Sequence, residues 1–203
     1  IEGNVYDSKG EHDACGVGFV ASTESKKSRK VVEFGIQALK AVWHRGAVDA
    51  DGKTGDGAGI HIEIPSDFFI ERIENAGRRH DEGTICVGMI FLPRNDYASQ
   101  EKCKTVVENE LLGRNYYIYR WRQVPVNTKV LGIKAESNRP EIVQVIFKSN
   151  NKNLKSDNLE RDLFVVRKKI EQQTAILKLR DFYICSFSSR TVIYKGMFLA
   201  EAL

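Results

Sequence analysis

The chain has 203 residues, 42% of them hydrophobic, with 16 glycines against 4 prolines, so it can form a sizeable core and is neither disordered nor collagen-like. Its formal net charge of +4 comes from 31 basic and 27 acidic residues that are interspersed along the sequence. Nucleic acid is therefore not the expected partner, because phosphate binding needs a basic stripe, and the short basic run at residues 26–30 is interpreted as a solvated loop.

The N-terminal residues 1–14 are polar, mixed in charge and without periodicity, which is typical of a leader outside the core. Cys15 then begins a glycine-punctuated apolar run that predicts a first strand over residues 15–21. Ser28 is predicted to cap a helix that ends at Gly46. The apolar positions that recur at helical spacing in it are Val32, Ile36, Leu39 and Trp43.

Residues 46–59 are rich in glycine and acidic side chains and run into a predicted strand at residues 60–64. The segment is not a Walker loop, because no Gly-Lys-Ser/Thr follows, and it is not a dinucleotide fingerprint, because it enters a strand instead of a helix. It either presents backbone amides to a ligand or lets another segment pack closely against it. Composition alone leaves both interpretations open.

The rest of the chain mixes predicted helices and strands without strict alternation. Helices are expected at residues 65–77, 99–112 and 159–177, and strands at residues 85–92, 116–124, 142–147, 182–187 and 191–194. The last two strands are predicted to form a hairpin through Ser188, Ser189 and Arg190. We therefore expect an α+β fold built in layers.

The four cysteines lie far apart in the sequence, with no Cys-x-x-Cys pair and no histidine at metal-ligand spacing. A zinc or iron–sulfur site within this chain is therefore not expected. Cys86, Cys103 and Cys185 lie in apolar or helical patterns, which is typical of reduced, buried thiols. No apolar run approaches the roughly 18 residues that span a bilayer, and no secretory signal is recognisable, so we expect a cytoplasmic protein without membrane contact.

Cys15 is the candidate nucleophile, because its thiol would lie at the mouth of a buried strand. A thiol must be helped to become a thiolate by an imidazole, a cation or an amine. His12 and His44 are the nearest histidines in sequence or motif, but nothing fixes either as its partner. The α-amino group of Cys15, with an ordinary pKa of about 7.7–8.0, is the alternative base, provided that residues 1–14 are removed. The local sequence alone favours a buried structural thiol.

Several ordered motifs resemble the class II glutamine amidotransferase domain of the glutamate synthase family. They include Cys-Gly-Val-Gly-Phe-Val-Ala at residues 15–21, His-Arg-Gly-Ala at 44–47, Thr-Gly-Asp-Gly-Ala-Gly-Ile at 54–60, Gly-Met-Ile-Phe-Leu-Pro at 88–93, Trp-Arg-x-Val-Pro-x-Asn at 121–127, and Tyr-Lys-Gly-Met at 194–197. The resemblance covers essentially the whole chain in order. Such a series of unusual motifs at compatible spacing is not expected by coincidence.

The resemblance implies an N-terminal-nucleophile (Ntn) hydrolase fold with αββα layers, of which this chain would supply the N-terminal half. Residues 1–14 would be a propeptide, and residues 15–203 the N-terminal portion of the amidotransferase domain. Cys15 would attack the carboxamide of glutamine, release ammonia and leave a glutamyl thioester that water hydrolyses to glutamate. Arg45 would help to shape the site, and Gly46 would offer a backbone contact to the substrate.

The same resemblance implies a longer parent enzyme. Ammonia would pass to a flavin site in another domain, where 2-oxoglutarate is reductively aminated. FMN and an iron–sulfur cluster are implied for that parent enzyme, and no cofactor for this chain. The remaining domains of glutamate synthase would be its partners, and exposed sheet edges would favour self-association.

The chain also departs from the family pattern. The family's His-x-Arg-Phe-Ser/Thr segment, which binds the glutamine carboxylate, and its Asn-Gly-Glu segment, which forms the oxyanion hole, would fall after Leu203. Because one lost oxyanion donor typically costs about a hundredfold to a thousandfold in rate, we expect little or no glutaminase activity from this polypeptide alone. The alternative is a stand-alone, non-catalytic half-domain with a binding or regulatory role.

Overall fold

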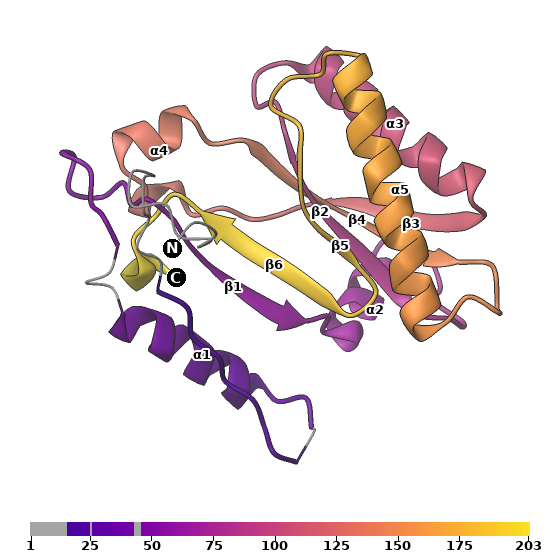
Figure 1. The fold of residues 1–203 in the computed structure, drawn as a ribbon, viewed down its shortest axis with the longest axis horizontal. Helices are drawn as coiled ribbons and strands as arrows, with labels where there is room; N and C mark the ends of the chain where they lie inside the picture. Colours follow the sequence, from indigo (N-terminus) through magenta and orange to yellow (C-terminus); the bar gives the residue numbers. More distant parts are fainter. Residues whose placement is uncertain (1–15, 25, 43–45) are drawn as a thin grey trace, which may run out of the picture.

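The computed structural model describes residues 16–24, 26–42 and 46–203. Two antiparallel sheets lie at the centre of this part of the chain (Figure 1). One has the strand order β3 (Tyr116–Gln123), β4 (Glu141–Ser149), β2 (Ile85–Leu92) and β5 (Tyr183–Ser188), and the other pairs β1 (Ala58–Glu63) with β6 (Thr191–Gly196). The helices are α1 (Arg29–Ala41), α2 (Ser66–Glu74), α3 (Tyr97–Gly113), α4 (Ile133–Ser137) and α5 (Ser156–Ile176), with short 3-10 turns η2 (Thr128–Val130) and η3 (Ala200–Ala202).

Helices α3 and α5 cover one face of the four-stranded sheet (Figure 1). The buried residues of α5 recur every three or four positions, so that Leu159, Leu163, Val166 and Ile170 form one apolar stripe, with Thr174 buried beyond its end. This stripe packs with Val107 of α3 and Phe147 of β4 in one continuous cluster. The main core of the molecule therefore lies between these two helices and the sheet.

The opposite face of the four-stranded sheet packs against the two-stranded sheet and α2. Met89 of β2, Val192 of β6 and Phe69 of α2 meet in this second cluster, and each of them is almost completely buried. Helix α1 lies on the outer side of β1, where Gly35 approaches the side chain of Ile60. The order of layers is thus a helical pair, a large sheet, a small sheet and a single helix.

Strands β5 and β6 do not form the predicted hairpin, because β5 pairs with β2 while β6 pairs with β1. The turn between them is held by side chains. The Ser188 hydroxyl accepts hydrogen bonds from the N–H groups of Arg190 and Thr191, at 2.9 and 3.2 Å. Glu160 of α5 accepts from the N–H of Ser189 at 2.7 Å. The chain therefore crosses from one sheet to the other at this turn.

The strand predicted over residues 15–21 is also not observed in its described part, residues 16–21, which is irregular. Val17 and Phe19 are 93% and 90% exposed, so the apolar run is not buried. Strand geometry needs a neighbouring strand to pair with, and none of the described residues pairs with this segment. Helix α1 ends at Ala41, before the predicted stop at Gly46.

The other predicted elements are confirmed to within a few residues. The strand at residues 85–92 has the predicted bounds. Helix α1 begins after Ser28, whose side chain accepts a hydrogen bond from the N–H of Lys30 as an N-cap. The short helix α4 was not predicted. The mixture of helices with antiparallel sheets agrees with the expected α+β class.

Candidate active site

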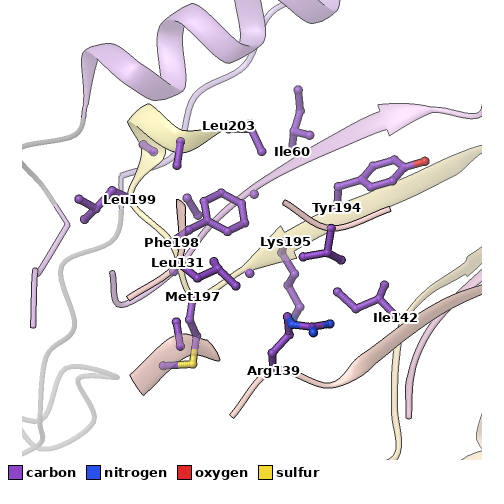
Figure 2. A pocket seen from close by; sticks show the side chains of 18 of the residues that line it. Ile60, Leu131, Arg139, Ile142, Tyr194, Lys195, Met197, Phe198, Leu199 and Leu203 are labelled. Atoms are coloured by element: carbon purple, nitrogen blue, oxygen red, sulfur yellow. The ribbon is translucent and has the colours of Figure 1, made fainter. Parts of the chain in front are cut away.

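A cavity of about 1190 Å³ opens beside the two-stranded sheet. Its walls come from the end of α1, the glycine-rich segment at residues 46–59, strand β6 with the residues after it, and the segment at residues 124–140. Figure 2 shows Ile60, Leu131 and Leu203 around the ring of Phe198. The cavity is thus largely apolar, with a few polar groups on its wall, which is the usual composition of a small-molecule site.

The glycine-rich segment forms one wall because other backbone segments approach it closely. A Cβ atom on Gly55 would lie 2.7 Å from the carbonyl oxygen of Phe198, and one on Gly59 would lie 2.6 Å from that of Tyr194. Neither distance is compatible with a side chain. Gly57 has a φ of 139°, a conformation that favours glycine. Close packing therefore explains Gly55 and Gly59, and the backbone conformation explains Gly57.

The same segment is attached to α4 by polar contacts of Asp51 and of the buried Thr54. The Asp51 carboxylate accepts hydrogen bonds from the hydroxyl of Thr54 at 2.6 Å and from the N–H groups of Thr54 and Lys53 at 2.7 and 2.9 Å. Gly132, which precedes α4, lies so close to Asp51 and Thr54 that a Cβ there would overlap both. The Thr54 hydroxyl also accepts from the N–H of Ala135 in α4 at 3.3 Å. We name Asp51, Thr54 and Gly132 the loop anchor.

Hydrogen bonding sets the charge of the loop anchor. The Thr54 hydroxyl, followed by the N–H groups of Thr54 and Lys53, holds the pKa of the Asp51 carboxyl well below its ordinary value. A hydrogen bond from Lys134, together with the N–H of Ala50, also lowers the pKa of Asp49. Both carboxylates are therefore ionised at neutral pH.

Two of the three predicted site residues, Cys15 and Arg45, lie outside the described residues. The third, Gly46, is exposed and lines the cavity. Gly16, which follows Cys15 in the chain, lines the same cavity. The described neighbours of the predicted nucleophile and of the predicted substrate-binding arginine therefore lie on the wall of one cavity.

The polar residues on the cavity wall that were not identified from the sequence include Arg139, Tyr194 and Lys195. Arg139 donates to Glu136 at 3.0 Å, and Lys195 donates to the hydroxyl of Tyr183 at 2.8 Å. Tyr194 and Lys195 lie in a motif that carries the family resemblance, but nothing in that motif assigns them a role. Their convergence depends on how β6 folds onto β1, which no local pattern indicates.

The three described cysteines lie in the cores. Burial raises the pKa of the Cys103 thiol to about 11, and it also raises the pKa values of Cys86 and Cys185. Such thiols are protonated at neutral pH and are poor nucleophiles. Within residues 16–24, 26–42 and 46–203, no group of three or more His, Cys, Asp or Glu side chains could hold a metal ion.

None of the helices in the described part of the chain is long and apolar enough to cross a membrane.

Comparison with known proteins gives a consistent result. Residues 15–203 match the family model described as "Glutamine amidotransferases class-II". The glutamate synthase [NADPH] large chain of Azospirillum brasilense is 54% identical over 200 residues, which cover 98% of this chain and 13% of that protein. The ferredoxin-dependent glutamate synthase of Pyropia yezoensis is 41% identical over 197 residues, covering 95% of this chain and 12% of that protein.

A third relative, the ferredoxin-dependent glutamate synthase 1, chloroplastic/mitochondrial, of Arabidopsis thaliana, is 39% identical over 202 residues, covering 98% of this chain and 12% of that protein. The chain therefore matches its relatives over nearly its whole length but spans only a small part of each of them.

Proposed function

This chain belongs to the class II glutamine amidotransferase family, and from that premise we propose that it is the part of a glutamate synthase that begins the hydrolysis of glutamine to glutamate and ammonia. Cys15 is the proposed nucleophile. The main support is that the family match begins at Cys15, while the next residue, Gly16, lines the same cavity as Gly46. The high pKa values of the three described thiols give a second argument, since none of them is suited to attack.

The proposed reaction needs residues 1–14 to be removed, because only a free α-amino group can act as a base. That amine takes the proton of the Cys15 thiol, and the thiolate attacks the carboxamide carbon of glutamine. The carbon–nitrogen bond breaks, ammonia leaves with the proton, and a glutamyl thioester remains. Water then cleaves the thioester, which releases glutamate and restores the thiol.

The neighbouring residues are proposed to hold the substrate. Arg45 shapes the site, and the backbone of Gly46 contacts the glutamine. The loop anchor fixes the glycine-rich segment that carries Gly46, so the position of this contact is set by Asp51 and Thr54. Preorganised contacts of this kind lower the entropic cost of reaching the transition state.

The layers described above support an Ntn-hydrolase arrangement of αββα type. Two sheets lie face to face, with α3 and α5 on one outer side and α1 on the other. We propose that residues 15–203 supply the N-terminal half of such a domain and that residues 1–14 are its propeptide. Because these 203 residues lack the family segments that bind the glutamine carboxylate and form the oxyanion hole, we expect them alone to turn over little glutamine.

The iron–sulfur cluster implied for glutamate synthases does not fit the described cysteines. A cluster needs several cysteine thiolates around one point. The described cysteines are buried thiols with raised pKa values, and no group of three metal-binding side chains occurs in the described ranges. We propose that the cluster lies in another part of a longer protein, together with the flavin and the use of ammonia that the family resemblance implies.

Intact-mass analysis with a diazoketone analogue of glutamine tests the proposal. The protein is studied as its gene encodes it and as the 203-residue chain. We expect the full-length protein to lack residues 1–14 and to gain one adduct on Cys15. A Cys15→Ser variant should gain none, while a Cys103→Ser variant should be labelled like the wild type.

Two results would contradict the nucleophile assignment. Labelling that persists in Cys15→Ser would move the nucleophile to another residue. A folded, full-length protein that stays unlabelled and does not hydrolyse glutamine would favour the alternative of a non-catalytic domain with a binding or regulatory role.

A further inference from the structure

Three arginine side chains gather where the edge strand β3 meets α2. Arg120 and Arg122 are two residues apart on β3, so they point to the same face of the sheet. The guanidinium carbon of Arg122 lies 5.2 Å from the ring centroid of Phe68, and that of Arg72 lies 4.8 Å from the same centroid. Arg120 donates to the carbonyl oxygen of Arg72 at 2.9 Å. We name Arg72, Arg120 and Arg122 the arginine cluster.

The positive charge of the arginine cluster is poorly balanced. Across the described ranges of the chain, the only carboxylate in ion-pair distance of the cluster is that of Glu71, 3.6 Å from Arg72, and its side chain is 58% exposed. Burial, together with the charges of Arg72 and Arg120, lowers the pKa of Arg122. Three cations held this close repel one another unless an anion lies between them.

One N–H group of the cluster also lacks an acceptor. The Nε atom of Arg72 is buried and has no hydrogen-bond partner within the described structure. A buried N–H without an acceptor is unfavourable, and such groups are rare in folded proteins. The orphaned donor and the unbalanced charge are independent observations, and both indicate that an acceptor with negative charge belongs at this position.

The hydrogen bonds beneath the cluster have a fixed direction. A guanidinium group can only donate, so the side-chain oxygen of Gln144 accepts from Arg122, at 2.8 Å. The amide nitrogen of Gln144 must then donate to the hydroxyl oxygen of Tyr194, at 3.0 Å. Gln144 is fully buried, so this direction cannot be exchanged with water. The hydroxyl proton of Tyr194 therefore remains available for a further acceptor.

We propose that Arg72, Arg120 and Arg122 form a binding site for an oxyanion, a carboxylate or a phosphate group, beside the hydroxyl of Tyr194. The planar forks of arginine match the paired oxygens of both groups. The oxyanion is either free in solution or a carboxylate side chain from another part of a longer protein. Since Tyr194 also lines the cavity, Gln144 connects this site to the cavity wall. The site is independent of the proposed nucleophile.

Titration with inorganic phosphate tests the site, with potassium chloride adjusted to keep the ionic strength constant. The ³¹P resonance of phosphate should broaden when the protein is present. The melting temperature of the protein should rise with phosphate concentration and reach a plateau. Arg122→Gln and Arg72→Gln should each weaken binding at least tenfold. Arg29→Gln removes the same charge from an exposed position on α1 and should bind phosphate like the wild type.

Circular dichroism without phosphate first shows whether each variant folds. If Arg122→Gln does not fold, Arg72→Gln still tests the site, because Arg72 is half-exposed on α2. Binding by both the 203-residue chain and the full-length protein would identify a free anion as the ligand. Binding by the shorter chain alone would identify a carboxylate of the longer protein. No saturable binding by either, or equal loss in Arg29→Gln, would overturn the proposal.

Discussion

Helices α5 and α1 lie on opposite outer sides of the two sheets and are stabilised in different ways. Four residues of α5 are buried in the main core, whereas none of α1 is buried. The region around α1 and the glycine-rich segment relies instead on close backbone contacts and on the loop anchor. The comparison shows that the scaffold is held by apolar packing and the cavity wall by polar groups and glycines. The two regions should therefore respond differently to the same kind of substitution.

The largest expected effect is the loss of an aromatic ring from the main core. Phe147→Ala should lower the free energy of unfolding by about 3 to 5 kcal/mol, because a fully buried ring leaves both lost contacts and a cavity. Phe34→Ala on α1 is the matched control and should cost about 1 kcal/mol or less, since Phe34 is 46% exposed. Urea denaturation measures both. Equal losses of stability in the two variants would contradict the inferred difference between the two regions.

A smaller effect is expected at the loop anchor. Gly132→Ala should destabilise the protein by about 1 to 3 kcal/mol, because the added methyl group overlaps Asp51 and Thr54. Gly113→Ala, at the end of α3, meets no atom and should stabilise the protein by about 0.4 to 1 kcal/mol. Thermal unfolding compares them. An unchanged melting temperature in Gly132→Ala would mean that the glycine-rich segment can move away from α4 without loss of stability.

Removal of the N-cap of α1 or of α3 should show whether the two helices unfold locally or together with the main core. Ser28→Ala in α1 and Asp96→Ala in α3 each remove one N-cap hydrogen bond, typically worth about 0.5 to 2 kcal/mol. In α1 the loss should appear as faster amide hydrogen exchange within that helix, with a smaller change in global stability. In α3 it should lower global stability, because α3 is part of the main core. Faster exchange throughout the protein in Ser28→Ala would show that α1 unfolds together with the scaffold.

The smallest expected effect is a change in the pH dependence of stability when Asp51 is substituted. The folded-state pKa of Asp51 is depressed, so its contribution to stability is present above the ordinary aspartate pKa of about 3.9 and is lost as the pH falls below it. The urea midpoint of Asp51→Asn should therefore fall less between pH 5 and pH 2.5 than that of the wild type. Glu74→Gln removes a carboxylate from an exposed helix end and is the control. Parallel pH profiles for Asp51→Asn and the wild type would contradict the assigned role.

The scaffold could be predicted from the sequence because its signals are local. Strand β2 is an uninterrupted apolar run, and α5 repeats apolar residues at helical spacing. The burial of β2 and the helical period of α5 can therefore both be recognised in the amino-acid sequence. The strand predicted at residues 15–21 was wrong in its described part for the opposite reason. Its pattern is that of a strand, but pairing depends on a neighbour that the pattern does not specify.

The arrangement around the cavity depends on contacts between distant residues. The segment at residues 188–190 has the polar composition of a hairpin turn, yet Glu160 from α5 helps to make it a crossing between sheets. Likewise, Gly132 and Asp51 meet although many residues separate them in the sequence. The sequence motifs could identify the glycine-rich segment as unusual, but they could not show which partner makes its glycines necessary. The roles assigned to Cys15, Arg45 and Gly46 remain predictions.

The pairing of β1 with β6 has a consequence for biosynthesis. Strands β2, β3 and β4 can pair as soon as residues up to 149 have left the ribosome, and α3 can join them. Strand β1 is made earlier than all of them, but its partner is residues 191–196, so it must wait until the chain has been extended to that point. A nascent chain can thus pair β2, β3 and β4 while β1, and the glycine-rich segment that leads into it, still lack β6. The glycine-rich part of the cavity wall is thus synthesised before β6 and the residues that follow it, and it can reach its final packing only after them.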